Sequence, residues 1–120
     1  MDTVFVILQA LLGLGFIAAG AMHLRAIGNP PYPERMEWLA AVPPPAMRVI
    51  GVLEVVGGLA LLGTIVVAAP WLAALTAGCI ALLMLSAIVF HLRRPGEMPN
   101  AVFNAIIGAF ALVVLYANIS

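Results

Sequence analysis

Long apolar runs separated by short polar breaks dominate the chain. Four such runs lie at residues 4–24, 48–69, 71–92 and 101–119. Each is long enough to cross a hydrocarbon core of about 30 Å as a helix of about 20 residues. We therefore predict an all-α membrane protein, with four transmembrane helices in an up-down-up-down bundle that forms a single domain over residues 1–120.

The breaks between the runs are rich in proline and glycine. Pro70 is the only break between the second and third runs, which predicts a tight hairpin there. The longest break, residues 25–47, has proline clusters near both ends. Between these clusters, residues 34–42 show a weak amphipathic pattern, which predicts a short helix lying on the membrane surface.

Composition supports this class of fold. Of the 120 residues, 65% are hydrophobic and 8% are charged, whereas soluble domains are about 45–50% apolar and about 25% charged. A soluble chain of this size could not bury so much apolar surface. The expected partner is therefore the lipid bilayer, and we expect no nucleic-acid partner.

The arginines predict the orientation. All five lie in or beside the first and third loops: Arg25, Arg35, Arg48, Arg93 and Arg94. Under the positive-inside rule both loops are cytoplasmic and both termini lie outside, in the cytoplasmic (inner) membrane. Trp38 and Trp71 lie near opposite ends of the predicted spans, which fits interfacial anchoring.

Small residues recur on the predicted helices at spacings that favour close packing in lipid. We expect the four helices to contact one another through these positions. They are Gly13 and Gly20; Gly51 and Gly58; Ala73, Ala77 and Ala81; and Ala101, Ala105 and Ala109.

Glu54 is the only acid in the second apolar run. An ionisable group at membrane depth costs at least about 2.5–3.5 kcal/mol, so it normally faces a protein interior or a water-filled cavity. Glu54 is therefore the first candidate for a functional site.

One polar residue from each predicted helix lies in the same half of the membrane as Glu54. At about 1.5 Å per residue, Glu54 and Ser86 lie about 10 Å from the cytoplasmic edge, and His23 and His91 about 3 Å. This grouping predicts a polar pocket that opens to the cytoplasm. Its candidate residues for ligand binding or proton relay are His23, Glu54, Ser86, His91 and Asn104.

The outer half carries only uncharged polar residues, which we expect to be scattered: Gln9, Thr64, Thr76 and Asn118. Helical geometry places His91 about 140° around the helix from Ser86, so both cannot point at one centre.

Each candidate also has a purely structural interpretation. The histidines can be interfacial, Asn104 and Ser86 can bond a neighbouring helix, and Glu54 can be a protonated acid bonded to a backbone carbonyl or Asn104. As a functional group, Glu and His together can relay protons or bind the polar head of a quinone. Two histidines and one glutamate lack the spacing of a metal site, so we predict none. Catalytic roles stay unknown.

Three segments carry a family resemblance: Ala19–Leu24, Gly51–Gly58 and His91–Arg94. With Gly-x-x-Glu-x-x-Gly in the second segment, the chain resembles the DoxX-like family of small four-helix membrane proteins. Position 23 is a histidine, where the family usually has lysine. The resemblance implies a role in membrane redox systems, including quinone-dependent sulfur oxidation and oxidative-stress complexes.

Three functions stay open at this point. The first is an accessory or quinone-associated component of a membrane redox system, partnered by a membrane or peripheral redox enzyme. The second is a small proton-coupled exporter of lipophilic compounds, and the third is a non-catalytic membrane assembly partner. The sequence shows no nucleophile–base pair and no cofactor motif, so we do not predict a stand-alone enzyme. A small chain has limited room for a cavity of about 300–1,000 Å³, so a site shared within a homo-oligomer is also open.

Overall fold

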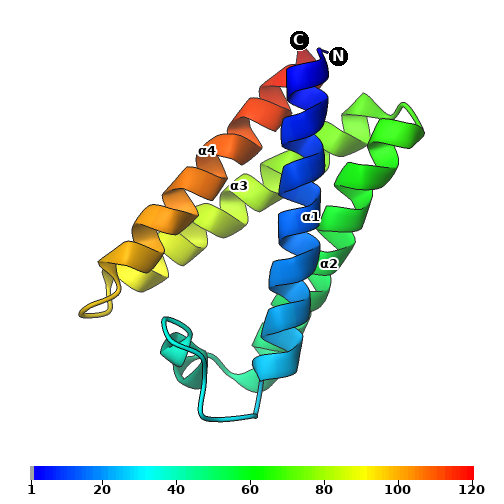
Figure 1. Ribbon diagram of the computed structural model, residues 1–120. Coiled ribbons are helices and arrows are strands. Elements are labelled where there is room, and N and C mark those ends of the chain that lie inside the picture. Colours follow the sequence, from blue (N-terminus) through cyan, green and yellow to red (C-terminus); the bar gives the residue numbers. More distant parts are fainter. Residues whose placement is uncertain (1) are drawn as a thin grey trace.

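The structure is a computed structural model that describes residues 2–120. Its four long helices are α1 (Thr3–Ala26), α2 (Pro44–Val66), α3 (Pro70–Leu92) and α4 (Met98–Ile119) (Figure 1). Each is long and apolar enough to cross a membrane. The predicted four-helix architecture is confirmed, and the chain is an integral membrane protein.

The helices form two antiparallel pairs, α1 with α2 and α3 with α4 (Figure 1). Both termini and the short α2–α3 turn lie at one end of the molecule, here called the terminal end. The first loop and the α3–α4 turn lie at the other, here called the loop end. The two helix pairs contact each other near the terminal end and diverge toward the loop end. They are therefore separated from one another at the loop end.

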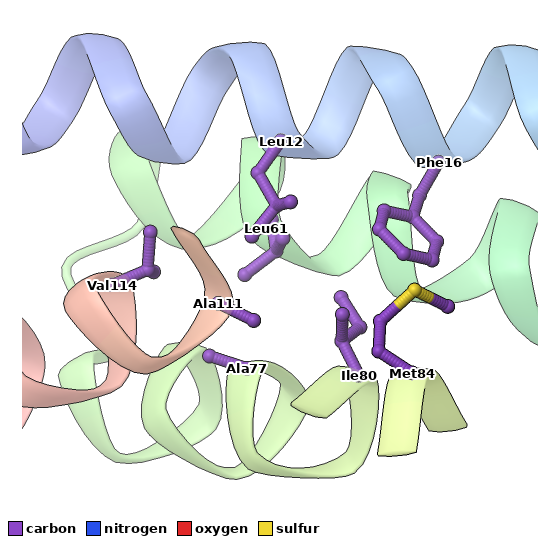
Figure 2. Close-up of a cluster of buried hydrophobic side chains, with 8 residues drawn as sticks. All are labelled: Leu12, Phe16, Leu61, Ala77, Ile80, Met84, Ala111 and Val114. Carbon is purple, nitrogen blue, oxygen red and sulfur yellow. The ribbon is translucent and has the colours of Figure 1, made fainter. Parts of the chain in front are cut away.

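A buried apolar cluster joins the two pairs in the part where they meet (Figure 2). All four helices contribute to it. Its members are Leu12, Phe16, Leu61, Ala77, Ile80, Met84, Ala111 and Val114. The cluster holds the pairs together, and Phe16 and Met84 mark its edge toward the loop end.

Glycines allow α1 and α2 to touch along their backbones. A methyl group on Gly20 would lie 2.6 Å from the carbonyl oxygen of Gly51, and one on Gly58 would clash with the carbonyl oxygen of Gly13. The contact predicted for these four glycines is therefore confirmed. It fixes which residues of α1 face which residues of α2.

The alanine pattern on α4 was misinterpreted from the sequence. Ala101 is buried, but Ala105 and Ala109 are exposed. Each step of four residues turns the side chain by about 40° around a helix of 3.6 residues per turn, so the alanines rotate away from the core. Gly108 and Ala111 face the core instead, and Gly108 packs against Met84.

The first loop contains less helix than the sequence predicts. A single 3₁₀ helix, η1 (Glu37–Ala41), replaces the amphipathic helix predicted over residues 34–42. Arg35 has a φ of 69°, in the left-handed region, so a right-handed helix cannot begin before it. Leu39 of η1 is buried in the protein.

Helix α2 begins at Pro44, four residues before the predicted span. Proline is suited to the first turn of a helix, because its missing N–H would have no partner there.

The polar residues of the terminal end are gathered, not scattered as expected. Gln9 Nε2 donates to the carbonyl of Leu61 at 2.8 Å and to Thr64 Oγ1 at 3.0 Å. Asn118 Nδ2 donates to Gln9 Oε1 at 3.0 Å. Gln9 is fully buried, so α1, α2 and α4 are joined by one hydrogen-bonded cluster. Thr76 takes no part, since its hydroxyl donates to Leu72 within α3.

Candidate functional site

His23 and Glu54 form a hydrogen-bonded pair between α1 and α2. His23 Nδ1 lies 2.7 Å from Glu54 Oε1. The close contact of Gly20 with Gly51, one turn before each residue, brings the two side chains together. The side chain of Glu54 is only 5% exposed. It therefore turns toward the protein, with an imidazole as its partner.

His91 and Glu97 form a second pair of the same kind at the α3–α4 turn. His91 Nδ1 lies 2.7 Å from Glu97 Oε1, and Arg94 Nε donates to Glu97 Oε2 at 2.6 Å. Gly96, with a φ of 80°, turns the chain so that Glu97 returns over His91. Both histidines thus bond a carboxylate through Nδ1.

Glu97 lies outside the predicted spans and has a perturbed pKa. Its burial raises the pKa, but the hydrogen bonds from His91 and Arg94 and their positive charges outweigh burial. The net effect holds the pKa of Glu97 below its ordinary value of 4.5. Glu97 is therefore an ionised acceptor near neutral pH.

Trp38 lies between the two histidines, a position that the sequence did not predict. Its ring centroid is 5.5 Å from that of His23 and 5.4 Å from that of His91, with edge-to-face geometry in both cases. Two contacts hold this part of the loop in place. Leu39 is buried beside it, and Asn100 Nδ2 donates to the carbonyl of Arg35 at 3.0 Å.

A cleft of about 840 Å³ lies between the helix pairs at the loop end. It falls in the size range of small-molecule sites, about 300–1,000 Å³. One chain therefore has more room for such a site than its small size led us to expect. All five predicted site residues line the cleft: His23, Glu54, Ser86, His91 and Asn104.

The rest of the cleft wall is mostly apolar. Aromatic and aliphatic side chains from α1, α3 and α4 surround the polar residues: Leu12, Phe16, Met84, Phe90, Phe103 and Ile107. A molecule that fits this wall has an apolar body and a small polar head. This is the usual pattern of a ligand pocket, in which few polar groups set the orientation.

Asn104 and Ser86 are less central than the two pairs. The Asn104 side chain is half-buried and makes no hydrogen bond among residues 2–120, so its amide is available to a ligand. Ser86 is exposed, and its hydroxyl donates to the carbonyl of Leu82 in its own helix. His91 is buried, which agrees with the expectation that His91 and Ser86 face different directions.

Sequence analysis did not single out Glu97, and it assigned Trp38 to the membrane interface. The sequence does carry a signal for Glu97. Pro95-Gly96 predicts a turn, and His91 and Glu97 lie on either side of it, so the turn can bring the two side chains together. No such signal exists for Trp38, because its position depends on how the first loop folds back between the helix pairs.

No group of three or more potential metal-binding side chains occurs within the described part of the chain.

The chain matches a known protein family. The model of the DoxX-like family matches residues 7–114, nearly the whole chain and all of the residues that form the two pairs. No curated protein and no solved structure matches the chain.

Proposed function

Because the chain belongs to the DoxX-like family, we propose a function that fits a small integral membrane protein with an internal cleft. The cleft binds the polar head of a lipophilic, quinone-type molecule, and the protein serves as an accessory component of a membrane redox system. One observation carries this proposal: two imidazoles, each bonded to a carboxylate, border the same apolar cleft.

The free nitrogen of each imidazole is available to a ligand. Nδ1 of His23 and of His91 is bonded to a carboxylate, and Nε2 of each has no hydrogen bond. Among residues 2–120 no buried side-chain nitrogen or oxygen lacks a partner. The two Nε2 atoms are therefore accessible, and both histidines line the cleft.

This arrangement suits both oxidation states of a quinone. A protonated Nε2–H donates to a quinone carbonyl, while a neutral Nε2 accepts from a quinol hydroxyl. The pairs can therefore follow the protonation state of the ligand without a large rearrangement.

The proposed orientation places the loop end at the cytoplasmic side of the inner membrane, because the arginines lie there. The opening of the cleft then lies near that surface, within reach of a peripheral redox enzyme. An electron-transfer partner at this surface completes the proposed system.

Titration of the reconstituted protein with decylubiquinone tests the proposal. Tryptophan emission in a Trp71→Phe background reports on Trp38, which lies at the cleft. We expect saturable quenching that is much weaker in Glu54→Gln. Asp2→Asn removes an acid at the other end while keeping a helix-capping side chain, and serves as the control. Equal binding by the wild type and Glu54→Gln would count against the proposal.

A proton-coupled exporter is the second candidate. The observation in its favour is a buried acid, Glu54, that lines the cleft between the helix pairs. Uptake of a lipophilic cation into proteoliposomes under an imposed pH gradient tests it, and the absence of uptake removes it. A pure assembly role predicts instead that Glu54→Ala still co-purifies with a fixed partner and supports its activity.

A further inference from the structure

A second, smaller cavity of about 170 Å³ adjoins the cleft at the loop end, here called the vestibule. Its wall is polar and largely exposed, with acidic residues Glu34 and Glu37 from the first loop. Four residues line both cavities: Arg35, Trp38, Pro99 and Asn100. They form a partition between the apolar cleft and the water-facing vestibule.

The His91–Glu97 pair crosses this partition. His91 lines the cleft and not the vestibule, whereas Glu97 lines the vestibule and not the cleft. The two side chains are joined by the 2.7 Å hydrogen bond at Nδ1. The imidazole of His91 thus lies at the cleft, and its Nδ1 contacts a carboxylate that lines the vestibule.

The two His–carboxylate pairs differ in this respect. His23 and Glu54 both line the cleft, and neither lines the vestibule. Their proton can move between the pair and a ligand, but the pair has no direct contact with the water-facing cavity. Only the His91–Glu97 pair connects the two.

We propose that the His91–Glu97 pair is the route by which protons pass between a ligand in the cleft and water in the vestibule. The inference rests on the proposed function, since it requires a ligand with an ionisable hydroxyl. The hydroxyl proton passes to Nε2 of His91, the Nδ1 proton passes to the Glu97 carboxylate, and Glu97 releases it to water. The O–H electron pair stays on the ligand oxygen, and the reverse sequence returns a proton.

The charges around His91 favour this route. Glu97 and Arg94 lie beside it at the α3–α4 turn, and the hydrogen bond from Arg94 favours the ionised form of Glu97, so that Glu97 passes a proton on to water rather than holding it. Arg35, Glu34 and Glu37 line the vestibule from the first loop. His23 and Glu54 lie across the Trp38 ring from His91.

A hydroxynaphthoquinone tests the route, because its visible absorption changes when its hydroxyl loses a proton. The protein is loaded with this probe in nanodiscs, the pH is changed by rapid mixing, and the bound probe is followed by absorption. Glu97→Gln removes the proton acceptor, and its affinity for the probe is measured separately so that rates are compared at equal occupancy. We expect the proton-exchange rate to fall by about 100-fold, the lower range for a positioned acid–base group.

Two further variants make the result specific. Glu97→Asp keeps a carboxylate, and we expect it to restore most of the rate, which a purely structural role of Glu97 does not explain. Asp2→Asn, at the opposite end, keeps the wild-type rate. If Glu97→Gln does not fold, the comparison of the wild type with Glu97→Asp and His91→Gln is made in its place, with slow exchange expected only in His91→Gln.

The outcomes separate the two proposals. If the wild type does not bind the probe, the proposed ligand site is wrong. If the probe binds but exchanges protons as fast in Glu97→Gln and His91→Gln as in the wild type, the ligand site stands and the proton route is overturned.

Discussion

The two ends of the bundle carry polar clusters built partly on the same helices, yet the clusters differ in every property that matters for function. At the terminal end Gln9, Thr64 and Asn118 are neutral and bonded to one another in a closed interior. At the loop end two histidines and Glu54 border an open cleft, and Glu97 bonds one of these histidines from the adjoining vestibule. We therefore expect the saturated polar residues of this bundle to serve assembly, and the ionisable, accessible ones to interact with a ligand.

The difference follows from how the helix pairs are arranged. Helices α1 and α2 contribute to both clusters and stay in contact along their glycines. At the terminal end α4 joins them through Asn118, whereas toward the loop end the α3–α4 pair diverges from α1–α2 (Figure 1). The space left by this divergence is the cleft, and Trp38 occupies part of its mouth.

Removal of the buried acid has the largest expected effect. Glu54→Leu leaves Nδ1 of His23 without its carboxylate, and we expect the affinity for decylubiquinone to fall by about 10- to 100-fold. This corresponds to about 1.5–3 kcal/mol for a hydrogen bond to a charged group. Fluorescence titration measures the change. Unchanged affinity in a folded Glu54→Leu variant contradicts the functional assignment of the loop end.

Loss of the indole comes next. Trp38→Ala removes three aromatic contacts, to His23, Phe90 and His91, of about 0.5–1.5 kcal/mol each, so we expect decylubiquinone affinity to fall by about tenfold. Trp38→Phe retains an aromatic ring, and we expect it to retain most of the affinity. Trp71→Ala, which changes an exposed tryptophan, serves as the control. Isothermal titration measures all three variants, since the fluorescent reporter is lost. A similar loss in Trp71→Ala shows that the effect is not specific to the cleft.

The terminal end gives the opposite pattern. Gln9→Leu removes bonds to Leu61, Thr64 and Asn118, and we expect the free energy of unfolding to fall by about 1–2 kcal/mol, since interhelical bonds in membranes contribute modestly. Unfolding in mixed micelles measures this loss. Ligand affinity stays unchanged, and a large loss of affinity shows that the two ends are not separable.

The smallest effect concerns pH. The pKa of Glu97 is lowered in the folded protein, so its carboxylate adds stability above pH 4.5, its ordinary pKa, and that stability is lost as the pH falls through the lowered pKa. We expect the free energy of unfolding of the wild type to exceed that of Glu97→Gln by less than about 1 kcal/mol near neutral pH, as for partly exposed ion pairs. This difference in the free energy of unfolding disappears at acidic pH. Unfolding of both proteins across this pH range measures it, and a gap that widens in acid contradicts the assigned ionisation.

Much of the fold was predictable from the sequence because lipid imposes simple rules on helices. Span length identified all four helices, and glycine spacing indicated which positions pack closely, although not which helices they join. Depth along the helices placed Glu54 and the histidines at one end, and that proximity is seen in the structure.

The pairing of these residues was not predictable, because it depends on the rotation of each helix about its axis. The same uncertainty hid the Gln9 cluster, whose members come from helices far apart in sequence. The alanines of α4 show how a small-residue pattern misleads when the inward stripe carries other residues, Gly108 among them. The positions of Trp38 and Glu97 depend on the conformation of the loops. This conformation is set by residues with a left-handed backbone conformation, such as Arg35 and Gly96.

Solid-state NMR on the protein in lipid tests the central claim most directly. Decylubiquinone labelled with ¹³C at its carbonyls is added to protein labelled with ¹⁵N, and dipolar recoupling detects which nitrogens lie close to the head group. The account predicts contacts to the imidazoles of His23 and His91. Contacts to Gln9 and Asn118 without either histidine, or to no protein nitrogen at all, would contradict it.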